Sequence, residues 1–147
     1  KEKYKIKAKT KVITQTELKP DEDQITEIAL KYLNAPYLWG GRSPYGIDCS
    51  GFTQMVYKFF GIRLKRDAYQ QAEQGRTIDY IDHTQTGDLA FFHNEDGKIK
   101  HVGIILQHKK IIHASGCVRI DSIDHHGIYN HDKKTYSHNL RFFKRIL

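Results

Sequence analysis

The sequence of 147 residues has few of the features that mark disordered, membrane or disulfide-rich proteins. Only three residues are Pro and 11 are Gly, and 39% are hydrophobic, so the composition is that of a folded chain. The longest apolar runs, at 89–92 and 102–106, are far shorter than the roughly 20 residues that span a bilayer. Two cysteines could form at most one disulfide. We therefore expect one domain with a single core and no membrane span.

The net charge of +7 suggests at first sight a nucleic-acid or other polyanionic partner, but its distribution argues against one. Residues 1–20 contain seven Lys and two Glu, which leaves a net charge of only +2 for the rest of the chain. Lys occupies every odd position from 1 to 11, as in a strand with one basic face, and lysines commonly protect edge strands from aggregation. We interpret residues 1–22 as a basic strand or linker and residues 23–147 as the functional domain, with no nucleic-acid partner.

The first half of the domain shows helical periodicity. Pro20 and an acidic first turn predict a helix that reaches Asn34, and apolar spacing predicts a second helix from Cys49 to Gly61. A short third helix is expected within 66–74. Between the first two helices, residues 35–48 contain two Pro and three Gly, which predicts a structured loop whose aromatic side chains are packed down.

The second half shows the period of two that is typical of strands. Strands are expected at 87–93, 99–106, 110–115, 117–123 and 139–146. Turns are expected at 94–97 and 107–109, and residues 124–138 are expected to form a longer surface loop. Helices followed by a meander of strands predict an α+β fold.

Cys49 is the first candidate for chemistry. At the start of a helix, free N–H groups and the helix dipole favour thiolate over thiol, which would make the cysteine a nucleophile. A lone cysteine is also one of the most buried residue types and is usually inert. The cysteine therefore indicates an active site only if a base lies beside it.

His101 and His113 are the candidate base and its orienting partner, because each is polar among apolar neighbours on a predicted strand. If the turn between the strands has an odd number of residues, position 101 is opposite 115 and the two histidines share a face. An even number would place them on opposite faces. On one face, His113 could hydrogen-bond to His101 and fix its tautomer while His101 faces the thiol, and Gly103 would keep space beside the base.

Six motifs follow one another along the chain: Ala35-Pro36-Tyr37-Leu38-Trp39-Gly40-Gly41, Asp48-Cys49-Ser50-Gly51-Phe52, Arg66-Asp67-Ala68 with Gln70-Gln71, Gly87-Asp88-Leu89 with Phe91-Phe92, His101-Val102-Gly103-Ile104, and Ile112-His113-Ala114-Ser115. In this order they closely resemble the NlpC/P60 family of papain-like cysteine peptidases, from about residue 24 to residue 147. The resemblance implies a papain-like α+β fold in which the cysteine helix packs on an antiparallel sheet. It also implies that a triad of Cys49, His101 and His113 cleaves peptidoglycan stem peptides, typically between D-γ-glutamate and a diamino acid, without a metal or other cofactor.

The same resemblance suggests how substrate is held. The Tyr37 hydroxyl and the backbone N–H of Cys49 are candidate oxyanion donors, although packing accounts for Tyr37 equally well. Asp48 is either a plain helix N-cap or, with Ser50, a site for the free amine of an N-terminal L-Ala.

Three further residues are assigned to the substrate groove: Trp39, Arg66 and Asp67. Trp39 is nevertheless more typical of an anchor for its Gly-rich loop than of a substrate platform. Where the family pattern often has a small hydroxyl residue before the Gln pair, this chain has Ala68-Tyr69, a change that could narrow or reshape the substrate groove.

Relatives that require a free amine commonly close the pocket with an upstream SH3-like domain, and residues 1–22 are interpreted as a possible remnant of such a module. A peptidoglycan substrate would place the protein in the periplasm or at the cell exterior. Two other classes stay open. One is an N-acetylmuramoyl-L-alanine amidase of the CHAP type, which has the same order of Cys and His. The other is a non-catalytic domain that binds polyanions through its basic start or zinc through its histidines and Cys117.

Overall fold

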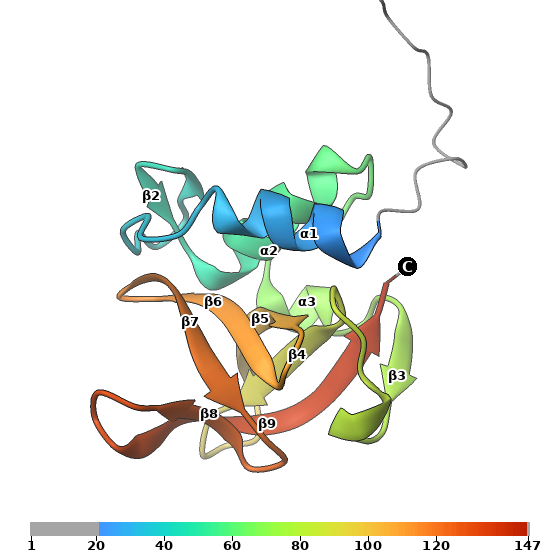
Figure 1. The fold of residues 1–147 in the computed structure, drawn as a ribbon, viewed down its shortest axis with the longest axis vertical. Helices are drawn as coiled ribbons and strands as arrows, with labels where there is room; N and C mark the ends of the chain where they lie inside the picture. The colour runs from blue at the N-terminus through green and yellow to red at the C-terminus, as the bar shows by residue number, and fades with distance from the viewer. Residues whose placement is uncertain (1–20, 147) are drawn as a thin grey trace, which may run out of the picture.

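The computed structural model describes residues 21–146, so the predicted basic strand at 1–12 lies outside the described residues. Helices α1 (Glu22–Leu30) and α2 (Cys49–Phe59) lie together on one side of a curved sheet (Figure 1). Asp21 caps α1 by accepting a hydrogen bond from the backbone N–H of Gln24. The helix ends four residues earlier than expected, because residues 31–34 form a turn that ends with Asn34 at φ 68°.

Helix α2 begins at Cys49 as expected, and its apolar stripe faces the sheet. Phe52 and Val56 are fully buried, and the hydroxyl of buried Tyr57 donates to the backbone carbonyl of Gly87. The third helix, α3 (Ala68–Gln71), is a single turn and is shorter than expected, and a capping box formed by Asp67 and Gln70 stabilises its start.

The main sheet is antiparallel and closes on itself. Its strands are β3 (Arg76–Ile78), β4 (Leu89–His93), β5 (Ile99–Leu106), β6 (Lys110–Ser115), β7 (Cys117–Ile123), β8 (Gly127–Asn130) and β9 (Thr135–Arg145). The strand order is β3-β9-β4-β5-β6-β7-β8, and β8 also pairs with β9, so β4 to β9 form a closed barrel (Figure 1). The structure confirms the α+β fold and the bounds predicted for β5, β6 and β7.

The expected surface loop at 124–138 is wrong in part. It contains β8 and the first residues of β9, which join as a hairpin around residues 131–134. The polar composition of this segment concealed strands whose inward residue Ile128 is fully buried. The short strand β3 and the 3₁₀ turn at Ile81–His83 were also not anticipated.

Apolar side chains form two clusters, one on each face of the sheet, rather than the single core expected. The first lies between the helices and the sheet and contains Phe52, Val102 and Ile112. The second fills the barrel and contains Phe92 and Ile105. Because strand residues alternate between faces, a closed sheet covered by helices on one side has two buried faces. Among residues 21–146, no helix is long and apolar enough to cross a membrane.

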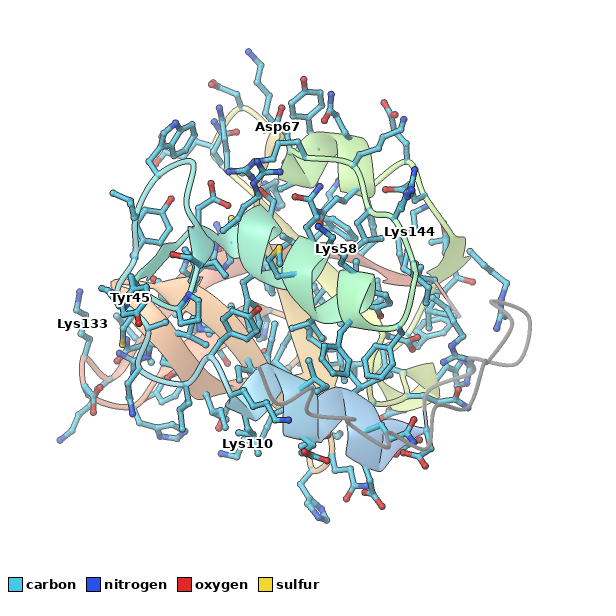
Figure 2. The ribbon with its side chains drawn as sticks, turned by 90° about the horizontal axis from the view of Figure 1, so that it is seen from above. Tyr45, Lys58, Asp67, Lys110, Lys133 and Lys144 are labelled. Carbon is cyan, nitrogen blue, oxygen red and sulfur yellow. The ribbon has the colours of Figure 1, made fainter. Side chains whose placement is uncertain are left out.

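The loop before α2 contains a small hairpin, β1 (Arg42–Ser43) and β2 (Gly46–Ile47). Its aromatic side chains are not packed down as expected. Trp39 is 85% exposed and Tyr45 is 92% exposed, and Figure 2 shows Tyr45 at the periphery of the molecule. The hairpin is held instead by buried Ile47, so the aromatic residues remain at the surface.

Candidate active site

Cys49 is the first residue of α2 and lies at the wall of a pocket of about 430 Å³. Asp48, in extended backbone conformation, is the N-cap. The backbone N–H groups of Val102, Ser50 and Cys49 itself lie near the sulfur of Cys49 and act to lower the pKa of its thiol. Since Val102 directly follows His101 on β5, the start of α2 lies against the part of β5 that carries the predicted base.

The protonation states at this site are set mainly by burial. Burial raises the pKa of Cys49 to about 11, which outweighs the three N–H groups that favour the thiolate. Burial, together with the charges of His113 and His138, holds the pKa of His101 well below its ordinary value of 6.5. The helix start does favour the thiolate as expected, but the resting pair is a neutral thiol and a neutral imidazole.

His101 and His113 meet as the spacing predicted. The turn between β5 and β6 has three residues, and Ile105 is opposite Ile111, so the register places both histidines on the same face. Nε2 of His101 lies 2.8 Å from Nδ1 of His113, with the rings nearly perpendicular. This bond leaves Nδ1 of His101 as the ring nitrogen that is free to face the thiol.

Gly103, on the same face, makes room for the orienting histidine. A Cβ atom placed there would lie 2.7 Å from Cδ1 of Ile111 and 2.9 Å from Cβ of His113. The space beside Gly103 is therefore filled by protein side chains rather than left open as expected.

Two residues of the site were missed from the sequence: Asp121 and Arg119 on β7. Oδ2 of Asp121 lies 2.9 Å from Nε2 of His113, and both of these side chains are almost fully buried. Arg119 donates to both oxygens of Asp121, at 2.7 Å from Nε and 2.9 Å from Nη2. Arg119, Asp121 and Ile123 alternate along β7 and therefore share one face, and this period of two was the signal in the sequence that could have identified Arg119 and Asp121.

His138 on β9 was also missed. Its ring stacks on that of His101 with centroids 4.1 Å apart and 28° between the planes. Ligand nitrogens of His101, His113 and His138 lie within 4.8 Å of one another. Three imidazoles that bind one metal ion point their ring nitrogens at that ion. The rings of His101 and His138 are instead stacked in nearly parallel planes, so their nitrogen lone pairs do not point at a common metal position. Burial and the charge of His113 together lower the pKa of His138 to about 4, although the charge of Asp121 acts to raise it.

Asp48 joins the helix cap, the Gly-rich loop and Arg66. Its Oδ1 accepts from the backbone N–H of Gly51 at 2.6 Å and from Nη1 of Arg66 at 3.1 Å. Its Oδ2 accepts from Nη2 of Arg66 at 2.6 Å and from the backbone N–H of Gly40 at 2.8 Å. Nη1 of Arg66 also donates to Oγ of Ser50. Burial opposes ionisation of Asp48, but the donors outweigh it and lower the pKa of this carboxyl.

The NlpC/P60 family matches residues 34–138, a range that holds Cys49, His101 and His113 and most of the chain. The chain belongs to the NlpC/P60 family. It is 38% identical over 97 residues to a Bacillus cereus protein named gamma-D-glutamyl-L-lysine dipeptidyl-peptidase, covering 65% of this chain and 29% of that one. It is 39% identical over 80 residues to the Escherichia coli murein DD-endopeptidase MepS/murein LD-carboxypeptidase, covering 54% of this chain and 42% of that one.

The fold agrees with this membership. A crystal structure of an NlpC/P60 family protein from Bacillus cereus aligns with a TM-score of 0.76 at 30% identity, over 91% of this chain and 43% of that one. The chain thus spans well under half the length of these relatives.

In this NlpC/P60 domain, the predicted substrate residues line one pocket. Tyr37, Trp39, Asp48, Ser50, Arg66 and Asp67 line it together with Cys49. Trp39 lines the pocket and is exposed, so it is not the buried anchor that its loop suggested. Asp67 lies beside α3 (Figure 2). Exposed Tyr69, in place of the small hydroxyl residue of the family pattern, also lines the pocket.

Two more side chains, Gln71 and Tyr37, interact with residues at the start of α2. Buried Gln71 donates through Nε2 to the carbonyls of Ser50 and Lys65, and its Oε1 accepts from Oγ1 of Thr53. Gln71 therefore ties α3 to the first turn of α2. Tyr37 lies near enough for the charge of Cys49 to add to burial in raising the pKa of its phenol.

Proposed function

We propose that this domain is a cysteine peptidase that hydrolyses peptidoglycan stem peptides at the bond between D-γ-glutamate and a diamino acid. The observation that carries the proposal is a cysteine at a helix start that lines a pocket and lies against the backbone of Val102, the neighbour on β5 of a histidine that is hydrogen-bonded to a second histidine. Relatives named for γ-D-glutamyl-L-lysine and murein peptide bonds support this substrate class. Such a substrate lies in the cell envelope, so the proposed place of action is the periplasm or the cell exterior.

The proposed reaction is a two-step acyl transfer. Sγ of Cys49 attacks the γ-glutamyl carbonyl while its proton passes to Nδ1 of His101. The imidazolium then gives that proton to the amine of the leaving diamino acid, and a thioester remains on Cys49. Water, deprotonated by His101, hydrolyses the thioester and restores the thiol. The backbone N–H of Cys49 and the hydroxyl of Tyr37 are the proposed donors to the oxyanion.

The binding of the substrate's free amine by Asp48 stays a proposal with a specific constraint. Gly40, Gly51 and Arg66 already donate to both oxygens of this carboxylate. An incoming ammonium group would have to share an oxygen with Arg66 or shift the guanidinium, and Ser50 is the neighbouring acceptor.

An upstream domain, proposed to be SH3-like, would complete the pocket in a longer protein. The exposure of Trp39 at the pocket and of Tyr45 nearby on the same loop supports this proposal. Apolar rings of this size gain free energy when a neighbouring surface covers them.

The test is the digestion of L-Ala-γ-D-Glu-L-Lys and of the corresponding diaminopimelate peptide, with products identified by mass. We expect release of the free diamino acid by the unchanged protein and a loss of at least 10³-fold in kcat for Cys49→Ala. Cys117→Ala is the matched control, since this cysteine lies at the start of β7 outside the pocket lining. Full activity of Cys49→Ala would disprove the mechanism.

The CHAP-like amidase makes a different product from muropeptides. It would separate the lactyl group of the glycan from L-Ala and leave the γ-glutamyl bond intact. Detection of that product alone, with intact tripeptide, would replace the endopeptidase proposal by the amidase.

The role of Asp48 predicts a requirement for a free N-terminus. Acetylation of the substrate's L-Ala removes the ammonium charge. We expect kcat/KM to fall by at least tenfold, because the charge-assisted hydrogen bond between the substrate ammonium and the Asp48 carboxylate is lost. The measurement is kcat/KM for paired free and acetylated peptides. Equal values would leave Asp48 as a helix cap and a partner of Arg66 only.

A further inference from the structure

The hydrogen bonds around His113 extend beyond the two histidines of the proposed mechanism. Nδ1 of His113 is bonded to His101, and Nε2 is bonded to Asp121, so both ring nitrogens have fixed partners. The Asp121 carboxylate is held in turn by two hydrogen bonds from Arg119. A continuous chain of contacts thus runs from the guanidinium of Arg119 to the imidazole of His101.

The charge of Asp121 determines the direction of these hydrogen bonds. Burial alone would raise the pKa of Asp121, but hydrogen bonds from His113 and Arg119 outweigh it and lower this pKa to about 2. The carboxylate is therefore ionised at neutral pH and can only accept. Consequently Nε2 of His113 carries a proton, and in the neutral ring Nδ1 is left with a lone pair.

The same reasoning applies to His101, the next side chain in this series of hydrogen bonds. The lone pair on Nδ1 of His113 must accept from His101, so the proton of neutral His101 lies on Nε2. Nδ1 of His101 then carries the lone pair that can take a proton from Cys49. If the proton of His113 moved to Nδ1, His101 would carry its own proton on Nδ1 and could not act as a base.

We propose that Asp121, oriented by Arg119, is a positioning residue that fixes the tautomers of His113 and His101 so that the lone pair of His101 faces Cys49. This inference rests on the proposed function and adds a residue to its machinery. Asp121 acts through His113 and does not touch the substrate pocket.

Within residues 21–146, the surroundings of His113 contain no second group that could take this role. The titratable or charged side chains against it are His101 from β5, Asp121 and Arg119 from β7, and His138 from β9. Of these, only Asp121 has a carboxylate. Among the described residues, the carboxylate of Asp132 reaches Arg119 at 2.9 Å but is largely exposed and contacts the guanidinium alone.

The first test observes the tautomers directly and needs no substrate. In ¹⁵N-labelled protein near neutral pH, imidazole nitrogen shifts and their couplings to ring protons show which nitrogen carries hydrogen. We expect protonated Nε2 and unprotonated Nδ1 in both His113 and His101. Protonated Nδ1 in His113 would overturn the proposal, whether or not any variant folds.

The second test compares Asp121→Asn with Asp132→Asn. Asparagine can donate through its amide, so the first variant allows the reversed tautomers and leaves substrate contacts unchanged. We expect kcat to fall roughly 10- to 100-fold with KM within about twofold, and imidazole shifts that report reversed tautomers. Asp132→Asn takes the other carboxylate from Arg119 and is expected to keep kcat and the imidazole shifts.

The outcomes separate this inference from the proposed function. Equal kcat in the two folded variants, or imidazole shifts in Asp121→Asn that match the unchanged protein, would overturn the role of Asp121. If the unchanged protein fails to cleave the γ-glutamyl peptides, the proposed function fails, and the imidazole shifts still decide the tautomers. A purely structural role would lower the melting temperature of Asp121→Asn without moving kcat per folded molecule.

Discussion

At the scale of single residues, the site depends on the environment of each side chain more than on its type. Cys49 and Cys117 are both unpaired cysteines, yet only Cys49 is at a helix start and lines the pocket. His101 is surrounded by Phe92 and two other imidazoles, an environment that disfavours a positive charge. Because the Cys49 thiol and the His101 imidazole are both neutral and buried at rest, charges form on them only when the sulfur attacks the substrate.

Gly103 provides a residue-level prediction. In Gly103→Ala, the added Cβ would lie under 3.0 Å from side-chain atoms of Ile111 and His113, and Cβ of His113 is fixed to its strand. We expect a loss of about 1–3 kcal/mol in the free energy of unfolding from overpacking. We also expect a lower kcat as His113 moves away from His101. The measurements are urea unfolding and kcat on the same preparation, and unchanged kcat in the folded variant would mean that the pair tolerates displacement.

At the scale of elements, α2 joins the pocket to the sheet. Its first turn presents Cys49 to the pocket, and its apolar stripe packs Phe52 and Val56 against the strands that carry the histidines. The stripe and the cap were both visible in the sequence, because helical spacing and an N-cap are local signals. The same holds for β5 and β6, whose three-residue turn sets the register of His101 and His113.

Elements that depend on distant partners were predicted less well. β8 lies between β7 and β9, and its polar segment becomes a strand because two neighbouring edges supply hydrogen bonds. Likewise, the side chain of Trp39 is exposed, although its loop predicted that it would be packed down. These outcomes depend on tertiary contacts that no local pattern encodes.

At the scale of the whole molecule, buried titratable groups make stability depend on pH. The pKa of His138 is lowered to about 4 and that of His101 lies well below 6.5 in the folded protein, so the unfolded chain binds more protons as the pH falls. This part of the stability is complete above about pH 6.5 and is lost as the pH falls toward 4. Asp121, with a folded pKa of about 2 against an ordinary 3.8, adds stability that is lost between about pH 4 and 2.

Urea unfolding at a series of pH values measures both effects. We expect the free energy of unfolding to fall by on the order of 2 kcal/mol or more from pH 7 to 4, and further toward pH 2. His138→Phe should flatten the first decline and Asp121→Asn the second, while the same Phe substitution at exposed His125 is the matched control. A free energy independent of pH from 7 to 4 would contradict the burial of neutral imidazoles.

Local signals in the sequence predicted the α+β order, the bounds of β5, β6 and β7 and the cysteine at the start of its helix, and they placed His101 and His113 on one face if the turn between their strands had an odd number of residues. These follow from local periodicity, capping and turn length. The three-dimensional structure alone shows that the sheet closes into a barrel, which brings His138 from β9 against His101. It also decided that Asp121 and Arg119 complete the hydrogen bonds of His113, because these contacts require strand neighbours and burial that no local pattern specifies.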